Sequence, residues 1–199
     1  MALKQISSQT KHRRLLILVE CAIMVALAFI LDFLPLPRWP NGGSVSVTSL
    51  PLIYISYRHG LKWGVVTGFV HSVLQLMMGW YAPPAGTLAA VIACVLLDYI
   101  LAFTILGTAV IFVPLGGKNS LVGYGIGAVA ANLLRFGCSF LSGIFLWGSY
   151  APEGQPVWFY SLTYNGGYMI PNALVAAVCI VLLCTLADPK TLRPRRKKG

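Results

Sequence analysis

Residues 88–113 read LAAVIACVLLDYILAFTILGTAVIFV, an apolar run with a single charged residue, Asp98. About 20 helical residues span the hydrocarbon core of a bilayer, and this run is longer than that. A soluble domain must keep its surface wetted and carries roughly 25% charged residues. Here charged residues make up only 10% of the chain, and the mean hydropathy is +0.77. The sequence therefore predicts an integral membrane protein.

Four other long apolar runs accompany this one. They are residues 15–36, 61–80, 121–147 and 166–186. A shorter run, residues 50–57, is interpreted as a short or broken helix. Such a helix is tolerated in a membrane only where protein or a water-filled cavity surrounds it. We expect an all-α membrane protein of six transmembrane helices, the second one short, in a single domain over residues 1–199.

The distribution of positive charge predicts the orientation. With six spans, all of the 15 Lys and Arg residues except Arg38 and Arg135 fall on one side of the membrane. That side is cytoplasmic by the positive-inside rule. Both termini, a basic N-terminal segment (residues 1–14) and a basic tail (residues 188–199), are thus expected to be cytoplasmic. The net charge of +10 then marks the inner face of the membrane and attracts anionic lipid. Because this charge flanks the helices, nucleic acid is not expected as a partner.

Motifs for catalysis or metal binding are missing from the sequence. The five Cys residues are isolated within predicted spans, and no CxxC or Cys/His spacing for a metal occurs. Ser142 before Gly143, with His71 as a possible base, is the only hint of an intramembrane hydrolase, without GxSxG or HExxH. A secondary transporter usually has inverted repeats, and none is found. We expect neither an enzyme nor a cofactor.

Two ionisable residues lie about midway along predicted spans, Asp98 and Arg135. Charges at this depth are costly, so they indicate either function or mutual pairing. Two interpretations stay open at this point. The two residues form a structural ion pair, or Asp98 faces a cavity where it meets a cation or a heterocycle. Glu20 and Asp32 lie nearer the ends of the first helix, and no role is assigned to them.

Polar side chains recur at helical spacing near Asp98 and Arg135. The predicted outer loops are rich in aromatic residues, and the stretch from Trp147 to Tyr164 is longer than an anchoring belt requires. Aromatic faces stack on flat heterocycles and attract cations. These patterns together favour a pocket for a small polar-aromatic solute. The polar positions are Asn132, Arg135, Ser139 and Ser142 on one helix, Asn165, Tyr168 and Asn172 on another, and His71 and Gln75 on a third.

Three blocks of sequence match a known family: DYILAF at 98–103, GIFLWGSYA at 143–151, and YSL at 160–162 followed by Asn165 and Gly166. With these blocks, their order and their gaps, the chain resembles the thiamine-specific substrate-binding subunit (S-component) of energy-coupling-factor (ECF) vitamin transporters. The resemblance covers nearly the whole chain.

The resemblance implies a set of ligand contacts. Trp147 matches the tryptophan that stacks over the vitamin in this family. Tyr160 and Asn165 match polar contacts to the aminopyrimidine ring. Tyr99 and Gly143 match further positions that line the ligand.

Four other positions have implied roles with some difference in residue type or spacing. Asp98 falls where the family commonly has glutamate, so the ligand must sit closer or a water must bridge. Ser139 stands where a histidine is expected. Arg135 falls where a basic residue lies near the thiamine hydroxyl. Trp39 is the candidate for the tryptophan of the first outer loop.

Small residues four positions apart let helices approach closely. Ala22 and Ala26 have this spacing and match the motif by which S-components dock on the transmembrane coupling subunit. Glycines with the same spacing at 60, 64 and 68 and at 123 and 127 either pack within the protein or dock a partner.

The implied function is a thiamine receptor in the bacterial cell membrane that works with a coupling subunit and its ATPase subunits. An S-component for another vitamin or precursor, such as hydroxymethylpyrimidine or riboflavin, is the alternative.

Overall fold

The computed structural model describes residues 2–40, 42–118 and 120–192. Within these ranges the chain is helical and has no strand beyond an isolated bridge between Arg38 and Ser44, which confirms the predicted all-α class. The part of the predicted basic tail after residue 192 lies outside the described residues. The elements are α1 (Ala2–Leu31), α2 (Ser49–His59), α3 (Leu61–Met78), α4 (Leu88–Cys94), η1 (Val95–Leu101), α5 (Ala102–Thr104), η2 (Ile105–Gly116), α6 (Ser120–Phe145), η3 (Gly148–Tyr150) and α7 (Val157–Leu186).

Four helical stretches are long and apolar enough to cross a membrane. They are Lys11–Leu31, Leu88–Gly116, Ser120–Phe145 and Val157–Leu186. The second of these runs without interruption through α4, η1, α5 and η2. Helices α2 and α3, with 11 and 18 residues, are not among the four. The predicted multi-pass membrane protein is confirmed at this level.

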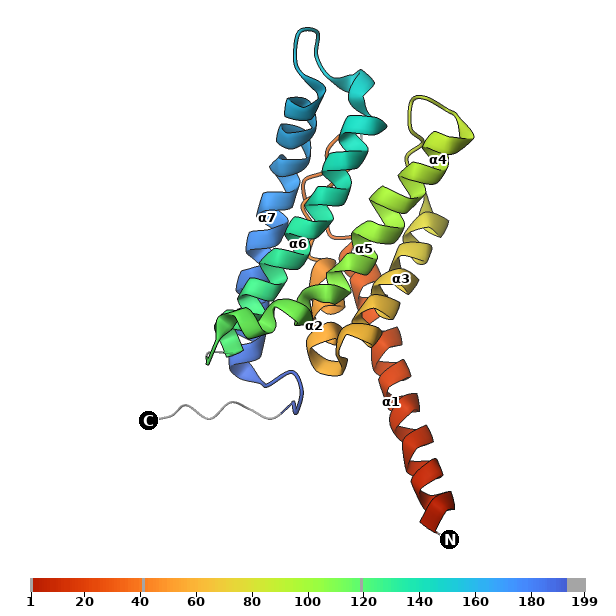
Figure 1. Cartoon of the computed structure of the whole chain (residues 1–199), viewed down its shortest axis with the longest axis vertical. Coiled ribbons are helices and arrows are strands. Elements are labelled where there is room, and N and C mark those ends of the chain that lie inside the picture. The colour runs from red at the N-terminus through yellow and green to blue at the C-terminus, as the bar shows by residue number, and fades with distance from the viewer. Residues whose placement is uncertain (1, 41, 119, 193–199) are drawn as a thin grey trace.

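The helices form one bundle in which α6 and α7 lie side by side, with α2 in the interior (Figure 1). Helix α1 extends well beyond the others. Its start and the end of α7 lie at the same end of the bundle (Figure 1). The turns between α3 and α4 and between α6 and α7 lie at the opposite end, which is where the cavity described below is found.

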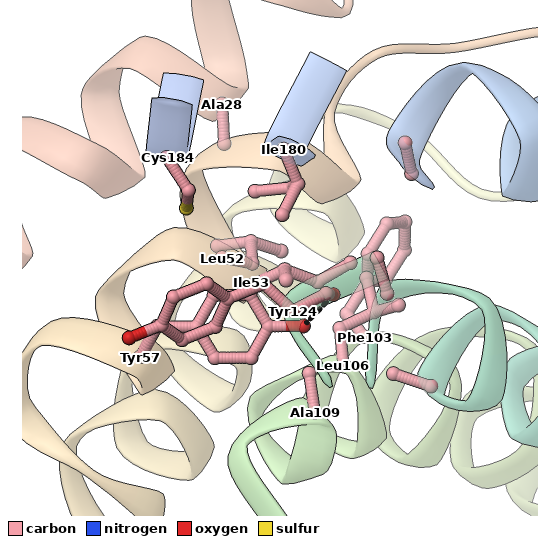
Figure 2. Packing of buried hydrophobic residues seen from close by; sticks show 13 residues of the cluster. Ala28, Leu52, Ile53, Tyr57, Phe103, Leu106, Ala109, Tyr124, Ile180 and Cys184 are labelled. Atoms are coloured by element: carbon pink, nitrogen blue, oxygen red, sulfur yellow. Dashed lines mark hydrogen bonds between the residues drawn. The ribbon is translucent and has the colours of Figure 1, made fainter. Parts of the chain in front are cut away.

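Helix α2 is short and enclosed by protein, as its sequence predicted. Leu52, Ile53 and Ile55 are fully buried, and the Tyr57 hydroxyl donates to the carbonyl oxygen of Tyr124 at 2.7 Å. Figure 2 shows Leu52, Ile53 and Tyr57 packed together with residues from α6, α7 and η2. An 11-residue helix is only about 16 Å long, too short for the hydrocarbon core, so its ends need protein around them.

Glycines allow the close approach of α3 to the helix that follows it. A Cβ at Gly107 would lie 2.2 Å from the carbonyl carbon of Gly64, and one at Gly68 would lie 2.5 Å from the carbonyl oxygen of Phe103. Gly123 and Gly127 pack in the same way against the backbone of η2. These glycines therefore pack within the protein. Ala22 and Ala26 on α1 differ, because both are exposed.

Several helix boundaries differ from the prediction, and α1 begins at Ala2 and not at Leu15. Helix α1 ends at Leu31 and not at Leu36, because the chain then approaches Pro35 and Pro37, which cannot continue a helix. Helix α7 begins at Val157, directly after Pro156, and not at Gly166. The predicted outer loop from Trp147 to Tyr164 is therefore wrong over its second half. Polar residues in the first turns of α7 interrupt the apolar run, so a prediction based on apolar runs misses this part of the helix.

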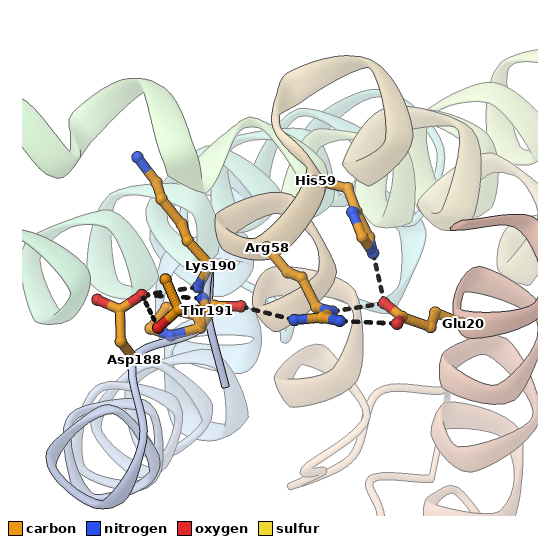
Figure 3. Close-up of polar contacts among 7 residues, drawn as sticks. Glu20, Arg58, His59, Asp188, Lys190 and Thr191 are labelled. Carbon is orange, nitrogen blue, oxygen red and sulfur yellow. Dashed lines mark hydrogen bonds and ion pairs between the residues drawn. The ribbon is translucent and has the colours of Figure 1, made fainter. Parts of the chain in front are cut away.

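An ion cluster ties together three segments at the end of the bundle opposite the cavity (Figure 3). Glu20 of α1 pairs with Arg58 and with His59, both at the end of α2. The Arg58 guanidinium also donates to the carbonyl oxygen of Pro189, after α7, at 3.1 Å. These are the ion pairs found among the described residues. Glu20, which had no role from sequence, thus joins α1, α2 and the segment after α7.

Candidate functional site

A cavity of about 380 Å³ lies between the turn after α1, the loop from 37 to 48, and helices α3, η1, α6 and α7. This volume is within the usual range of small-molecule sites. Its lining combines aromatic rings with four charged side chains. The charged residues are Asp32, Arg38, Asp98 and Arg135.

Asp98 and Tyr99 reach the cavity from a π-helical segment. The run from Val95 to Leu101, η1, interrupts an otherwise α-helical and 3₁₀-helical stretch. Short π segments are rare and often occur at functional sites, since the wide turn re-aims its side chains. The apolar run at 88–113 contains no signal for this change of winding, so the sequence did not predict it.

Neutral donors hold the Asp98 carboxylate by one of its two oxygens. Ser142 Oγ donates to Asp98 Oδ2 at 2.5 Å and Trp147 Nε1 at 3.2 Å, with Cys94 Sγ at 3.5 Å from the same oxygen. No hydrogen bond from the described residues reaches Oδ1. The carboxylate is thus oriented at the cavity wall with one oxygen left to meet a ligand.

Arg135 lies over the face of the Phe103 ring, with Cζ 4.4 Å from the ring centroid. Its Nε is buried and has no hydrogen-bond partner among the described residues. The structural ion pair between Asp98 and Arg135 is not formed, and that interpretation is wrong. Arg135 and Ser142 lie at different levels of α6: Ser142, which donates to Asp98, comes seven residues after Arg135, or about 10 Å along the helix axis.

Two tryptophans line the cavity from different loops. Trp147, just after α6, stacks on Tyr150 with 6.0 Å between ring centroids and 18° between planes. Trp39, in the loop after α1, lies 5.7 Å from the ring of Tyr168 on α7. A flat ligand in this cavity would have aromatic surface on more than one side.

The loop from 37 to 48 is fixed to α7 by Tyr164 and by Asn172, of which Asn172 belongs to the predicted polar stripe. The Tyr164 hydroxyl donates to the Gly42 carbonyl at 2.9 Å. The side-chain amide of Asn172 makes two hydrogen bonds to the loop: its Nδ2 donates to the Ser44 carbonyl at 3.0 Å, and its Oδ1 accepts from the Ser46 N–H at 2.7 Å. This loop therefore forms a structured wall of the cavity.

The structure brings most of the predicted ligand residues together. Lining the cavity are Asp98, Tyr99, Arg135, Ser139, Trp147, Asn165 and Trp39. Gly143 and Tyr160 are not among the lining residues. A Cβ at Gly143 would lie 2.1 Å from Ser161 Oγ, so this glycine serves the contact between α6 and α7. Tyr160 packs 5.5 Å from Tyr164, and it is Tyr164, one turn later, that reaches the cavity.

Asp32 is a lining residue whose place in the cavity the sequence did not reveal. Gln75 Nε2 donates to Asp32 Oδ2 at 3.1 Å, which joins the turn after α1 to α3. His71 and Gln75 show one-turn spacing in the sequence, but only Gln75 reaches the cavity. Asp32 has no spacing signal at all, because it lies beyond the end of α1.

Ala22 and Ala26 do not line this cavity. Both are exposed on α1, on a face that also exposes Ile23, Leu27 and Ile30, while Cys21 and Val25 point into the protein. No described element of the chain covers this face.

Comparison with known proteins gives concordant matches. The family described as thiamine transporter protein matches residues 18–192. A relative from Bacillus subtilis, named thiamine transporter ThiT, is 37% identical over 193 residues, which cover 92% of this chain and 97% of the relative. One of the same name from Lacticaseibacillus paracasei is 28% identical over 185 residues, covering 89% and 90%. The solved structure of ThiT from Listeria monocytogenes matches with a TM-score of 0.71 at 25% identity, over 86% of this chain and 94% of that one.

Proposed function

Because this chain belongs to the thiamine transporter family, we propose that it binds thiamine in the cavity under the loop from 37 to 48. It does so as the S-component of an ECF importer, a receptor that hands its ligand across the membrane when docked to an ATP-driven module. The observation that carries the proposal is the oriented carboxylate of Asp98 beside the indole of Trp147.

The chemistry of thiamine suits this cavity. Its aminopyrimidine ring is flat and carries hydrogen-bond donors and acceptors, and its thiazolium ring is permanently positive. Asp98 Oδ1 accepts from the amino group, and Trp147 stacks on a ring face. Asn165 supplies a side-chain amide from α7. Arg135, two turns deeper along α6, meets the hydroxyl end of the ligand.

Thiamine binding is expected to quench the tryptophan fluorescence of the purified protein, because a ring stacks on Trp147. Titration with thiamine, and with hydroxymethylpyrimidine and riboflavin as comparison ligands, measures this. Trp147→Phe should lose most of the signal change and bind more weakly. The matched control is Trp158→Phe, since Trp158 is exposed at the start of α7 and outside the cavity. Unquenched fluorescence together with no binding by calorimetry would refute a thiamine site.

For the membrane topology, the proposal is six spans in one domain over residues 1–199, with α2 and α3 as the second and third. Protein encloses the short α2, which supports its crossing inside the bundle. The start of α1 and the end of α7 lie at the same end of the bundle (Figure 1), and Arg58 at that end contacts Pro189 in the segment after α7. The positive-inside rule makes this end cytoplasmic, so that the cavity opens toward the outside.

Single cysteines introduced in a cysteine-free variant test this orientation in intact cells. Ser8→Cys and Lys197→Cys should resist an impermeant thiol reagent, because both termini face the cytoplasm. Glu153→Cys, in the exposed turn before α7, should react and serves as the positive control. Labelling of either terminal cysteine before cell lysis would refute the proposed topology.

The partners in this proposal are a transmembrane coupling subunit and its ATPase subunits. The exposed face of α1 around Ala22 and Ala26 is the docking surface. Its small side chains let a partner helix approach closely, and the flanking apolar side chains suit a contact within the membrane.

A further inference from the structure

The Asp32 carboxylate lies at the end of a helix, where the backbone carbonyl groups already carry partial negative charge. It lies in the turn directly after α1 and lines the cavity. The unsatisfied carbonyl groups at the end of a helix make that end negative, so a carboxylate there is unfavourable unless a cation is near. The Arg38 guanidinium donates to the main-chain carbonyl of Asp32 at 2.7 Å and makes no ion pair with its carboxylate. Arg38 thus satisfies a backbone carbonyl at the end of α1 and does not pair with the Asp32 carboxylate.

The hydrogen bonds of Asp32 orient its carboxylate without neutralising it. Oδ2 accepts from Gln75 Nε2 at 3.1 Å. The contact of Oδ1 is with Thr48 Oγ1 at 3.5 Å, which is long for a hydroxyl donor, and the same hydroxyl is also engaged with Ser46. Both donors are neutral. One oxygen is therefore held firmly, and the other keeps the capacity to meet a ligand.

The charges inside the cavity do not cancel. Asp32, Asp98 and Arg135 lie in its interior, whereas Arg38 is exposed at the rim, where water screens it. No ion pair joins Arg135 to either carboxylate. The three interior groups sum to one negative charge when ionised. A ligand with one positive charge would balance them.

We propose that Asp32 is the counter-ion of the positive ring of the ligand and sets the preference of the cavity for cationic over neutral heterocycles. The inference rests on the proposed thiamine site and adds to it a specificity residue from the turn after α1. Asp32 and Asp98 share no hydrogen-bond partner, so each can contact a different part of one ligand. Asp98 then recognises the hydrogen-bonding ring, and Asp32 recognises the charge.

The test compares two ligands on the purified protein: thiamine, and an analogue in which a neutral thiophene ring replaces the thiazolium. Asp32→Asn should weaken thiamine binding at least about tenfold, or about 1.4 kcal/mol, and leave binding of the neutral analogue within about twofold. Asp32→Glu keeps the charge and should keep the preference for thiamine. Glu20→Gln, which removes a carboxylate of α1 outside the cavity, should bind both ligands as the unaltered protein does.

An equal loss of affinity for both ligands in Asp32→Asn would overturn the inference, because it would show a structural role for Asp32. Unchanged thiamine binding would overturn it too. If Asp32→Asn is too unstable to purify, Asp32→Ser is measured in its place, and the ratio of the two affinities decides in the same way. Failure of the unaltered protein to bind thiamine would refute the proposed function itself, which is a separate outcome.

Discussion

Replacing Asp98 by Asn is expected to weaken thiamine binding by about 2–5 kcal/mol, or roughly 30- to 4,000-fold in affinity. The substitution removes a charge from a cavity wall of low dielectric, where that charge acts on the ligand more strongly than in water. Asn keeps an oxygen that accepts from Ser142 and Trp147, so the protein without ligand should lose little stability. Calorimetric titration and the melting temperature without ligand, on the same preparation, measure the two effects separately.

The matched control for this variant is Asp188→Asn, the same change at a carboxylate outside the cavity. Asp188 accepts from the N–H groups of Lys190 and Thr191 in the segment after α7, and its loss should leave thiamine affinity unchanged. Near-normal affinity in Asp98→Asn with a large drop in melting temperature would contradict a ligand role for Asp98. It would make this carboxylate a structural group of the bundle.

Replacing both Ala22 and Ala26 by Leu is expected to reduce thiamine uptake at least tenfold while leaving thiamine binding intact. Overpacking a close helix contact costs typically 1–3 kcal/mol at each position, so two bulky residues should prevent docking on the coupling subunit. Ligand affinity should not change, because both alanines are exposed and neither lines the cavity. Uptake by cells and co-purification with the coupling subunit are the two measurements.

Ala89→Leu provides the control for this double variant, because Ala89 is an exposed alanine on α4, outside α1. It should affect neither binding nor uptake. A double variant that still co-purifies with the coupling subunit and sustains uptake would show that docking uses another surface.

The sequence predicted the parts of the fold that depend on the length and polarity of apolar runs. The long helices and the short, enclosed α2 follow from such runs because a membrane demands apolar length. The start of α7 did not follow, because Ser161, Thr163 and Asn165 lower the apolar signal although they are helical. The π-helical winding at Asp98 was also hidden, since nothing in the local residue types distinguishes it from an α-helix.

For the candidate site, prediction succeeded where a residue belonged to a matching block or to a helical stripe. Asp98, Trp147 and Asn165 are of this kind, and all three line the cavity. Gly143 and Tyr160 also belong to matching blocks, but Gly143 lies at the contact of α6 with α7 and Tyr160 packs on Tyr164, so neither lines the cavity. Asp32 could not be found in this way, because its partners come from distant segments that only the folded chain brings together.

The enclosed helix α2 also constrains how the protein is made. A segment enters the bilayer from the insertion machinery when its own side chains prefer lipid to water, and 11 residues offer too little apolar length for that. Part of the surface of α2 packs on η2, α6 and α7, which are synthesised after it. We therefore expect α2 to reach its final depth only once these later helices have been made and have packed against it. The helices made last would thus complete the packing around α2, one of the first to be made.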